Sequence, residues 1–309
     1  MKASLRIGTR GSQLALWQAR WVQAAIMRQQ PDVEVDLVII KTQGDKILDV
    51  PLAQVGGKGL FVKEIEEALL DGRIDLAVHS MKDMPAELPE GLTICAIPKR
   101  ENPLDALISV RYNSIDHLPE GARVGTSSLR RSAQLKHLRP DLVIVPLRGN
   151  LDTRLKKLET TDLDAIVLAA AGLMRLGLGH RITAYLTDEQ MLPAVGQGAL
   201  CIETRDADPE VQSIIESLDD PGTRTAVMAE RAFLKRLEGG CQVPIAGHAK
   251  AVGATVSLCG LVADLDGRTI IKNTMTGQVE RADRLGRSLG EDLLKRGAGP
   301  ILEGLQKDG

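Results

Sequence analysis

The stretch LRIGTRGSQLALWQARWVQAAIMRQQPDVEVDLVII, residues 5–40, decides the fold. Residues 5–8 are typical of a short strand, and Ser12 can cap a helix that runs to about Gln30. Residues 33–40 predict the next strand. Because neighbouring parallel strands need a crossover that is usually a helix, this order indicates a sheet covered by helices.

Strand and helix signals continue to alternate beyond this stretch. A helix from Leu60, closed by Gly72, precedes a short apolar strand at residues 74–78. A second series begins after the crossover expected at residues 98–103. Its strands are predicted at residues 123–125, 142–147 and 164–170, and its helices at 128–137 and 150–158. Two α/β domains of similar size follow from this pattern.

From about Pro221 the pattern becomes that of an α+β domain. A helix with an apolar stripe ends near residues 239–240, and a final helix is expected to stop at Gly297 and Pro300. Between them, antiparallel strands are predicted at residues 249–252, 255–263 and 268–272.

The predicted fold class is therefore α/β, with two α/β domains plus a C-terminal α+β domain that contains a small antiparallel sheet. Residues 198–204 are strand-like, so the chain is expected to return to the first domain. The predicted domains are residues 1–98 together with 196–218, residues 102–193, and residues 221–309.

Composition excludes several classes of function. The chain has 309 residues, of which 43% are hydrophobic, which is ample for two or three cores. A net charge of −2, a pI near 6.3 and only 2% aromatic residues argue against binding to nucleic acid or to anionic membranes. No secretory signal or membrane-spanning run is recognisable, so we expect a cytoplasmic protein.

Cys241 differs from the other cysteines in its setting. Cys95, Cys201 and Cys259 stand in apolar, strand-like runs and are expected to pack in the core. No C-x-x-C pair is present, which disfavours a zinc site, and no histidine has metal-ligand spacing. Cys241 lies in a glycine-rich loop, but no neighbouring base in the sequence would activate it as a nucleophile.

Polar side chains follow the predicted strands, where α/β sheets bind their ligands. Arginine recurs at these positions in both series, and a guanidinium suits bidentate binding of a carboxylate. A ligand with several carboxylates is implied, although phosphates would fit the same cluster. The candidate binding residues are Arg10, Ser12, Ser80, Lys82, Thr126, Ser128, Arg130, Arg131, Arg148, Arg154 and Arg175.

The pair Arg130 and Arg131 is the most informative part of this set. It falls in the first turn of a predicted helix, where the helix dipole disfavours positive charge by about 0.3–1 kcal/mol per residue. An anion at this helix start would remove the conflict. The alternative is that both side chains point into solvent.

Residues 55–59, VGGKG, do not fit a phosphate-binding P-loop, because the spacing of the glycines is wrong and no Ser or Thr follows Lys58. A mobile lid in which Lys58 closes on an anion is one interpretation. A plain surface loop is the other.

Asp83 follows a predicted strand and lies beside Lys82. A carboxylate beside a cation stays ionised and could stabilise positive charge that develops on a substrate. Alternatively, Asp83 only forms a turn ahead of Pro85.

Six strings in this order resemble the porphobilinogen deaminase, or hydroxymethylbilane synthase, family over nearly the whole chain. They are GTRGSQLAL (8–16), VGGKGLFVKE (55–64), HSMKD (79–83), GTSSLRR (125–131), LRGN (147–150) and EGGCQVP (238–244). One departure is Gln54, where related sequences often have lysine, so no role is carried over to it.

The resemblance implies two domains of the type II periplasmic-binding fold with the cysteine domain beside them. It implies a transferase of tetrapyrrole (porphyrin and haem) biosynthesis that joins four porphobilinogen molecules head to tail, releasing ammonia and hydroxymethylbilane. The chain would grow on a dipyrromethane cofactor held by a thioether to Cys241. Asp83 would be the catalytic residue, and the arginines would bind the acetate and propionate groups. The resemblance also implies a monomer.

Two other functions remain open at this point. A non-catalytic two-lobed receptor for a small carboxylate ligand would show much the same α/β pattern. A regulatory effector-binding module is the second, although no basic helix-turn-helix segment is visible to couple it to DNA.

Overall fold

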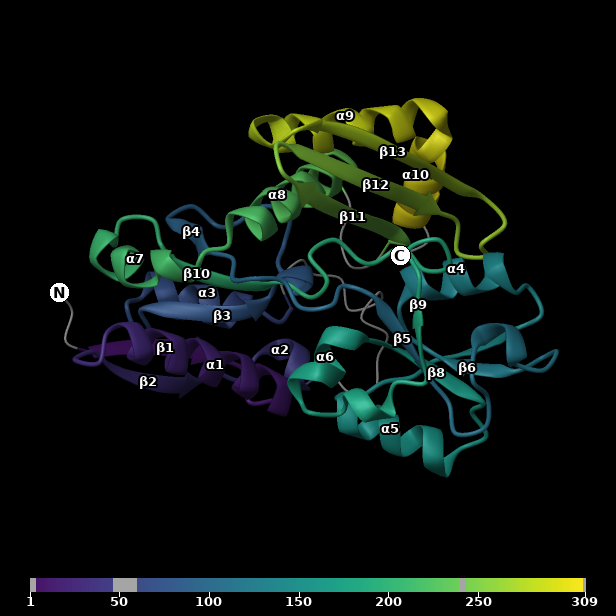
Figure 1. Cartoon of the computed structure of the whole chain (residues 1–309), viewed down its shortest axis with the longest axis horizontal. Helices are drawn as coiled ribbons and strands as arrows, with labels where there is room; N and C mark the ends of the chain where they lie inside the picture. The colour runs from purple at the N-terminus through teal and green to yellow at the C-terminus, as the bar shows by residue number, and fades with distance from the viewer. Residues whose placement is uncertain (1–3, 47–59, 239–242, 308–309) are drawn as a thin grey trace.

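The computed structural model describes residues 4–46, 60–238 and 243–307. The strands within these residues form three sheets (Figure 1). Gln54, Lys58 and Cys241 lie outside the described residues. Within the described part of the chain, no helix has both the length and the apolar character needed to cross a membrane.

The first sheet has the strand order β2-β1-β3-β10-β4. Strand β1 pairs in parallel with β2 and β3, whereas β10 pairs antiparallel with β3 and β4. Leu5 and Ile7 point into its core and are fully buried. The strands are β1 (Ser4–Thr9), β2 (Glu34–Ile39), β3 (Leu76–Ser80), β4 (Leu92–Ala96) and β10 (Leu200–Arg205), and the accompanying helices are α1 (Gln13–Gln29), α2 (Gln43–Lys46), α3 (Lys63–Leu70) and α7 (Pro209–Ile215).

The second sheet repeats this arrangement with the order β7-β6-β8-β5-β9. Strand β6 pairs in parallel with β7 and β8, whereas β5 pairs antiparallel with β8 and β9. The strands are β5 (Asp105–Ile108), β6 (Arg123–Gly125), β7 (Val143–Val145), β8 (Ala165–Ala169) and β9 (Ala184–Leu186), and the helices are α4 (Leu129–Leu138), α5 (Leu151–Thr160) and α6 (Ala170–Arg175).

The chain passes between these two sheets twice, and the two connecting segments lie side by side. The amide of Glu101 donates to the carbonyl of Gly198 over 3.1 Å, and the side-chain amide of Gln197 donates to the carbonyl of Pro103 over 2.7 Å. A Cβ at Gly198 would lie 2.4 Å from the Glu101 carbonyl oxygen, so only glycine allows this approach. In each sheet, the antiparallel strand is the one that follows a crossing.

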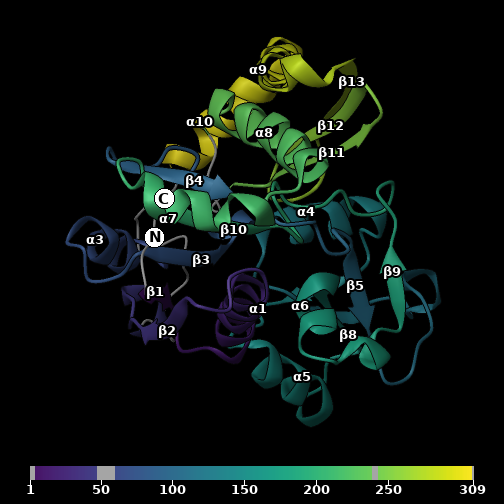
Figure 2. The same ribbon diagram turned by 60° about the vertical axis from the view of Figure 1, so that its left-hand side comes forward.

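The C-terminal part is an antiparallel sheet, β11-β12-β13, whose face is covered by α8 and α9 (Figures 1 and 2). The buried Phe233 lies at the centre of this core. The elements are α8 (Pro221–Arg236), β11 (Ile245–Val252), β12 (Thr255–Ala263), β13 (Ile270–Gln278), α9 (Ala282–Leu293) and α10 (Gly299–Lys307).

The predicted fold class is confirmed, with corrections near the C-terminus. Strand β13 extends to Gln278, well beyond the predicted end at residue 272, because it pairs along the whole of β12. The last helix does not end the fold. Gly297 has a φ of 105° and breaks the helix, but α10 follows with Pro300 in its first turn, where proline is tolerated.

Candidate functional site

Four of the predicted site residues border one small pocket. Arg10 and Ser12 reach it from the end of β1, and Ser80 and Asp83 reach it from the end of β3. The pocket has a volume of about 70 Å³. Parallel pairing of β1 with β3 places the carboxyl ends of both strands at one edge of the sheet, which brings these distant residues together.

Local contacts fix the side chains around this pocket. The Ser12 hydroxyl accepts from the amide of Ala15 and caps α1, as predicted. The Arg10 guanidinium lies 4.2 Å from the centre of the Phe61 ring, within the range of a cation–π contact. The amide group of the buried Gln18 donates to the Ser80 hydroxyl over 3.0 Å. Phe61, expected within a helix, stands just before α3 because that helix begins at Lys63.

Arg130 and Arg131 form ion pairs with a carboxylate of the protein itself. Both guanidinium groups are buried and bind the carboxylate of Asp105 at the start of β5, each over 2.7 Å. Burial alone would raise the pKa of Asp105, but Arg130 and Arg131 outweigh it and hold the pKa well below its usual range. The alternative that these arginines point into solvent is wrong.

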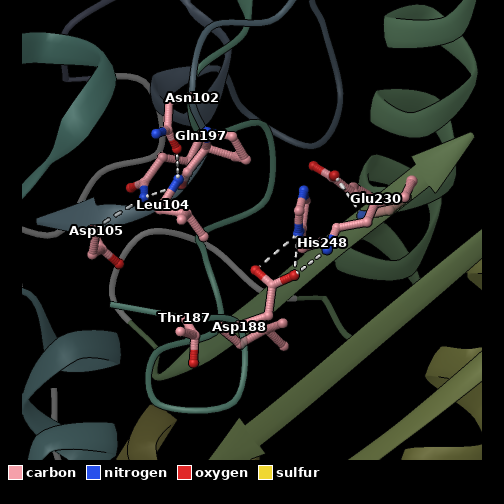
Figure 3. Close-up of polar contacts among 12 residues, drawn as sticks. Asn102, Leu104, Asp105, Thr187, Asp188, Gln197, Glu230 and His248 are labelled. Carbon is pink, nitrogen blue, oxygen red and sulfur yellow. Dashed lines mark hydrogen bonds and ion pairs between the residues drawn. The ribbon is translucent and has the colours of Figure 1, made fainter. Parts of the chain in front are cut away.

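Gln197 joins this group from the crossing segment. Its side-chain amide donates to Asp105 over 3.0 Å (Figure 3). The arginine pair in the second sheet is therefore tied directly to the connection between the sheets.

Electrostatic influence reaches from this pair to the end of β3. Burial lowers the pKa of Lys82 to about 8, the Asp83 carboxylate opposes that shift, and Arg131 adds to it. Burial also lowers the pKa of Arg154 to about 10, again with Arg131 adding and Asp83 opposing. The charge of Asp83 thus influences one cation beside it, Lys82, and one of the second α/β part, Arg154.

The other predicted binding residues stand at the corresponding edge of the second sheet. Thr126 is buried after β6, and Ser128 caps α4 by accepting from the amide of Arg131 over 3.4 Å. Arg148 follows β7 and is partly buried. Arg175 does not follow β8 directly, because α6 intervenes, and its guanidinium donates to the carbonyl of Gly198 over 2.7 Å.

Several residues around the site escaped the sequence reasoning. Asp105, Gln18 and Gln197 carry no local signal, since their partners are remote in sequence. His79 was noted only as part of a string, yet it lines the pocket and bonds the buried Glu203 over 3.1 Å.

The cysteines in the described part of the chain have no activated thiol. Cys201 is buried, and Cys95 and Cys259 are partly buried against core clusters, which agrees with packing roles. Burial raises the pKa of Cys95 to about 11 and raises that of Cys201 further. Among the residues described, no group of histidine, cysteine or carboxylate side chains could hold a metal ion.

Two family models match the chain. Residues 5–213 match the porphobilinogen deaminase, dipyromethane cofactor binding domain, and residues 224–295 match the porphobilinogen deaminase C-terminal domain. The chain belongs to the porphobilinogen deaminase family. The predicted family and its dipyrromethane cofactor are thereby confirmed, and the receptor alternative finds no support.

Curated relatives agree along nearly the full length. The chain is 58% identical over 303 residues to a porphobilinogen deaminase of Syntrophotalea carbinolica, which covers 98% of this chain and 96% of the relative. It is 54% identical over 302 residues to the porphobilinogen deaminase of Syntrophus aciditrophicus, with 98% and 99% covered. Among solved structures, it is similar to the methionine binding protein MetQ, with a TM-score of 0.45, 16% identity, and 70% and 89% of the two chains covered.

Proposed function

We propose that the protein is a porphobilinogen deaminase whose catalytic carboxylate is Asp83 and whose dipyrromethane cofactor is attached through a thioether to Cys241. The observation that carries the proposal is the pocket that joins Arg10, Ser12, Ser80 and Asp83 in a chain of this family. Cations and hydroxyls beside one carboxylate fit a substrate that brings carboxylates and forms cationic pyrroles.

The cation set fits the side groups of a growing pyrrole chain. Each porphobilinogen unit adds two carboxylates, so several fixed cations are needed along the chain's path. The residues we propose to bind cofactor and substrate are Arg10, Ser12, Lys58, Ser80, Lys82, Thr126, Ser128, Arg130, Arg131, Arg148, Arg154 and Arg175.

Asp105 divides these arginines into two kinds. Arg130 and Arg131 already bind an internal carboxylate, so a ligand carboxylate would share their guanidinium groups with Asp105. Arg10 and Arg154 are only partly buried and would reach ligand carboxylates more directly.

In the proposed reaction, Asp83 would transfer one proton in each addition. Each addition forms a carbon–carbon bond, breaks the bond between the aminomethyl carbon and nitrogen, and releases ammonia. The cofactor, when bound, supplies the ring at which the first addition occurs. One ring proton is lost and the departing amine takes one up, so a carboxylate between these positions can accept and return the same proton while stabilising the cationic ring.

Intact-protein mass spectrometry combined with turnover tests this proposal. Wild type should carry a dipyrromethane adduct and gain discrete additions with porphobilinogen, and Cys241→Ser should lose both. Asp83→Asn should keep the adduct but lose turnover by about 10²–10⁴-fold, the usual contribution of a proton-transferring group. An unmodified wild-type chain with full turnover would exclude the Cys241 attachment. Near-normal turnover in Asp83→Asn would remove Asp83 from the mechanism.

The remaining features of the proposal concern organisation. We propose the domain bounds 1–98 with 196–218, 102–193 and 221–309, one for each sheet. A monomer in the cytoplasm is also proposed, and size-exclusion chromatography with light scattering would test the monomer.

A further inference from the structure

Helix α8 lies along the segment that follows Asp83, with three residues spaced by four on one of its faces. Val227 packs with Met81 and Met84 in a buried cluster. Four residues later, Arg231 reaches the same segment, and after four more residues Lys235 pairs with Glu87 over 2.9 Å. Residues at this spacing share a helix face, so this part of α8 follows the segment residue by residue.

Arg231 makes the central contact of this face. Its guanidinium donates to the carbonyl of Pro85 over 2.9 Å and to that of Ala86 over 3.2 Å, and it also contacts the sulfur of Met81 over 3.9 Å. The side chain is only 7% exposed. Within the described residues Arg231 has no ion pair. Its buried guanidinium instead binds main-chain carbonyls of an irregular segment. Such charge-assisted bonds are about twice as strong as neutral ones.

Among the described residues, the segment that Arg231 contacts makes few backbone hydrogen bonds of its own. Asp83 ends a single 3₁₀ turn, Met81–Asp83, that is fixed at its start by the amide of Met81 donating to the carbonyl of Ala199. Beyond it, Pro85 lacks an amide hydrogen and the backbone is irregular up to β4. Arg231 therefore holds the exit side of the turn whose last residue is Asp83.

The other end of α8 leads to the cysteine motif. The helix ends at Arg236, and Glu238, the first residue of EGGC, has a left-handed φ of 52°.

We infer that Arg231 is a positioning residue that fixes Asp83 at the end of β3 by holding the segment that follows it against α8. This inference rests on the proposed function for its catalytic consequence. Its structural half, the support of residues 81–87, does not depend on any activity.

Amide hydrogen exchange tests the structural half. In cofactor-loaded Arg231→Met, amides of residues 82–88 should exchange faster than in wild type, because two carbonyl contacts are lost. Lys235→Met, which removes only the exposed pair with Glu87, is the matched control and should exchange like wild type. Unchanged exchange in Arg231→Met would show that Arg231 does not hold residues 81–87 in place, whatever reaction the wild type catalyses.

Steady-state kinetics tests the catalytic half. Arg231→Met should lower kcat by about 10²-fold, the typical effect of a misplacement near 1 Å, with KM close to that of wild type. Arg231→Lys keeps the charge without the planar fork and should be intermediate, which also covers the case in which Arg231→Met folds poorly. Lys235→Met should keep the wild-type kcat. A folded, cofactor-loaded Arg231→Met with wild-type kcat would overturn the positioning role.

A double-mutant cycle asks whether Arg231 acts through Asp83. In an Asp83→Asn background, Arg231→Met should cause little further loss of single-turnover rate. An equal fold loss in both backgrounds would show that Arg231 acts by another route and would reject the inference. If the wild type fails to consume porphobilinogen, the proposed function fails. The exchange result still decides whether Arg231 holds residues 81–87 in place.

Discussion

Glu66 is a buried carboxyl group whose pKa depends on how α3 packs against the first sheet. It lies in α3, is only 7% exposed, and is influenced by Glu203 and His79. Among the described residues, one carboxylate oxygen each of Glu66 and Glu203 finds no hydrogen-bond partner. Burial, followed by the charge of Glu203, raises the pKa of Glu66 to about 7; His79 lowers this pKa and Glu67 raises it, both by smaller amounts.

This raised pKa predicts a pH-dependent stability. In the unfolded chain Glu66 ionises near 4.5, so the folded state binds the proton more tightly and the free energy of unfolding falls as pH rises from 4.5 to about 7. Glu66→Gln escapes that loss, so its stability relative to wild type should be greater at pH 8 than at pH 5. Urea unfolding midpoints at the two pH values measure this. Glu67→Gln controls for net charge, and a pH-independent difference for Glu66→Gln would contradict the prediction.

Helix starts are the elements that the sequence predicts best. Ser12 caps its helix as expected, Ser128 caps the helix that was predicted to begin at this residue, and Asn150 caps α5 by accepting from the amide of Thr153 over 2.9 Å. These signals are local, because a cap and the amide it satisfies are three residues apart. Strands β5 and β9, by contrast, were not predicted, since they are short and their identity depends on pairing with β8 and with each other.

Helix α8 offers a test at this scale. Asp220 caps it by accepting from the amide of Thr223 over 2.8 Å, with Pro221 in the first turn. Asp220→Ala should lower the free energy of unfolding by about 1 kcal/mol, whereas Asp220→Asn should keep most of it, because asparagine caps equally well. Denaturant unfolding measures both. The kcat per folded molecule should not change, and a large fall in kcat for Asp220→Ala would show that the cap also positions the site.

At the scale of the whole molecule, Asp188 links the second α/β part to the C-terminal sheet. Its carboxylate lies 3.2 Å from the ring nitrogen of His248 in β11 and accepts a hydrogen bond from it (Figure 3). The same carboxylate pairs with Lys250 over 2.5 Å. The hydrogen bond from His248, and then Lys250, hold the pKa of Asp188 well below its usual range against the effect of burial. A second contact between these two parts joins α4 to the turn after β12, where a ring nitrogen of His137 bonds the carbonyl of Gly267 over 2.8 Å.

The link predicts a second pH dependence, of opposite sign. A depressed folded pKa gives stability that is present above the unfolded pKa near 3.8 and is lost as pH falls. Asp188→Asn should therefore cost about 2 kcal/mol at pH 7 and clearly less near pH 2, where the pH approaches the depressed pKa of the folded state. Thermal unfolding at both pH values tests this. Asp266→Asn, which loses only an exposed pair with Lys136, should cost less than about 1 kcal/mol, and an equal cost at both pH values for Asp188→Asn would contradict the role of its charge.

The sequence by itself determined the local features of this protein. The alternation of strands and helices, the capping residues and the six family strings are each contained within a few neighbouring residues, and they were enough for the fold class and the family. They also predicted Asp83 as the catalytic residue and the arginines as binding residues.

Only the tertiary structure decided what those side chains contact. For Arg130 and Arg131 the sequence predicted an anion at the start of their helix, and the pairing of β5 shows that the carboxylate of Asp105 is one such anion. Arg231 was not singled out in the sequence, and α8 brings its guanidinium to carbonyls more than 140 residues earlier in the chain. The physical reason is the same in both cases: a buried charge must find a partner, and which partner is near depends on how distant segments pack.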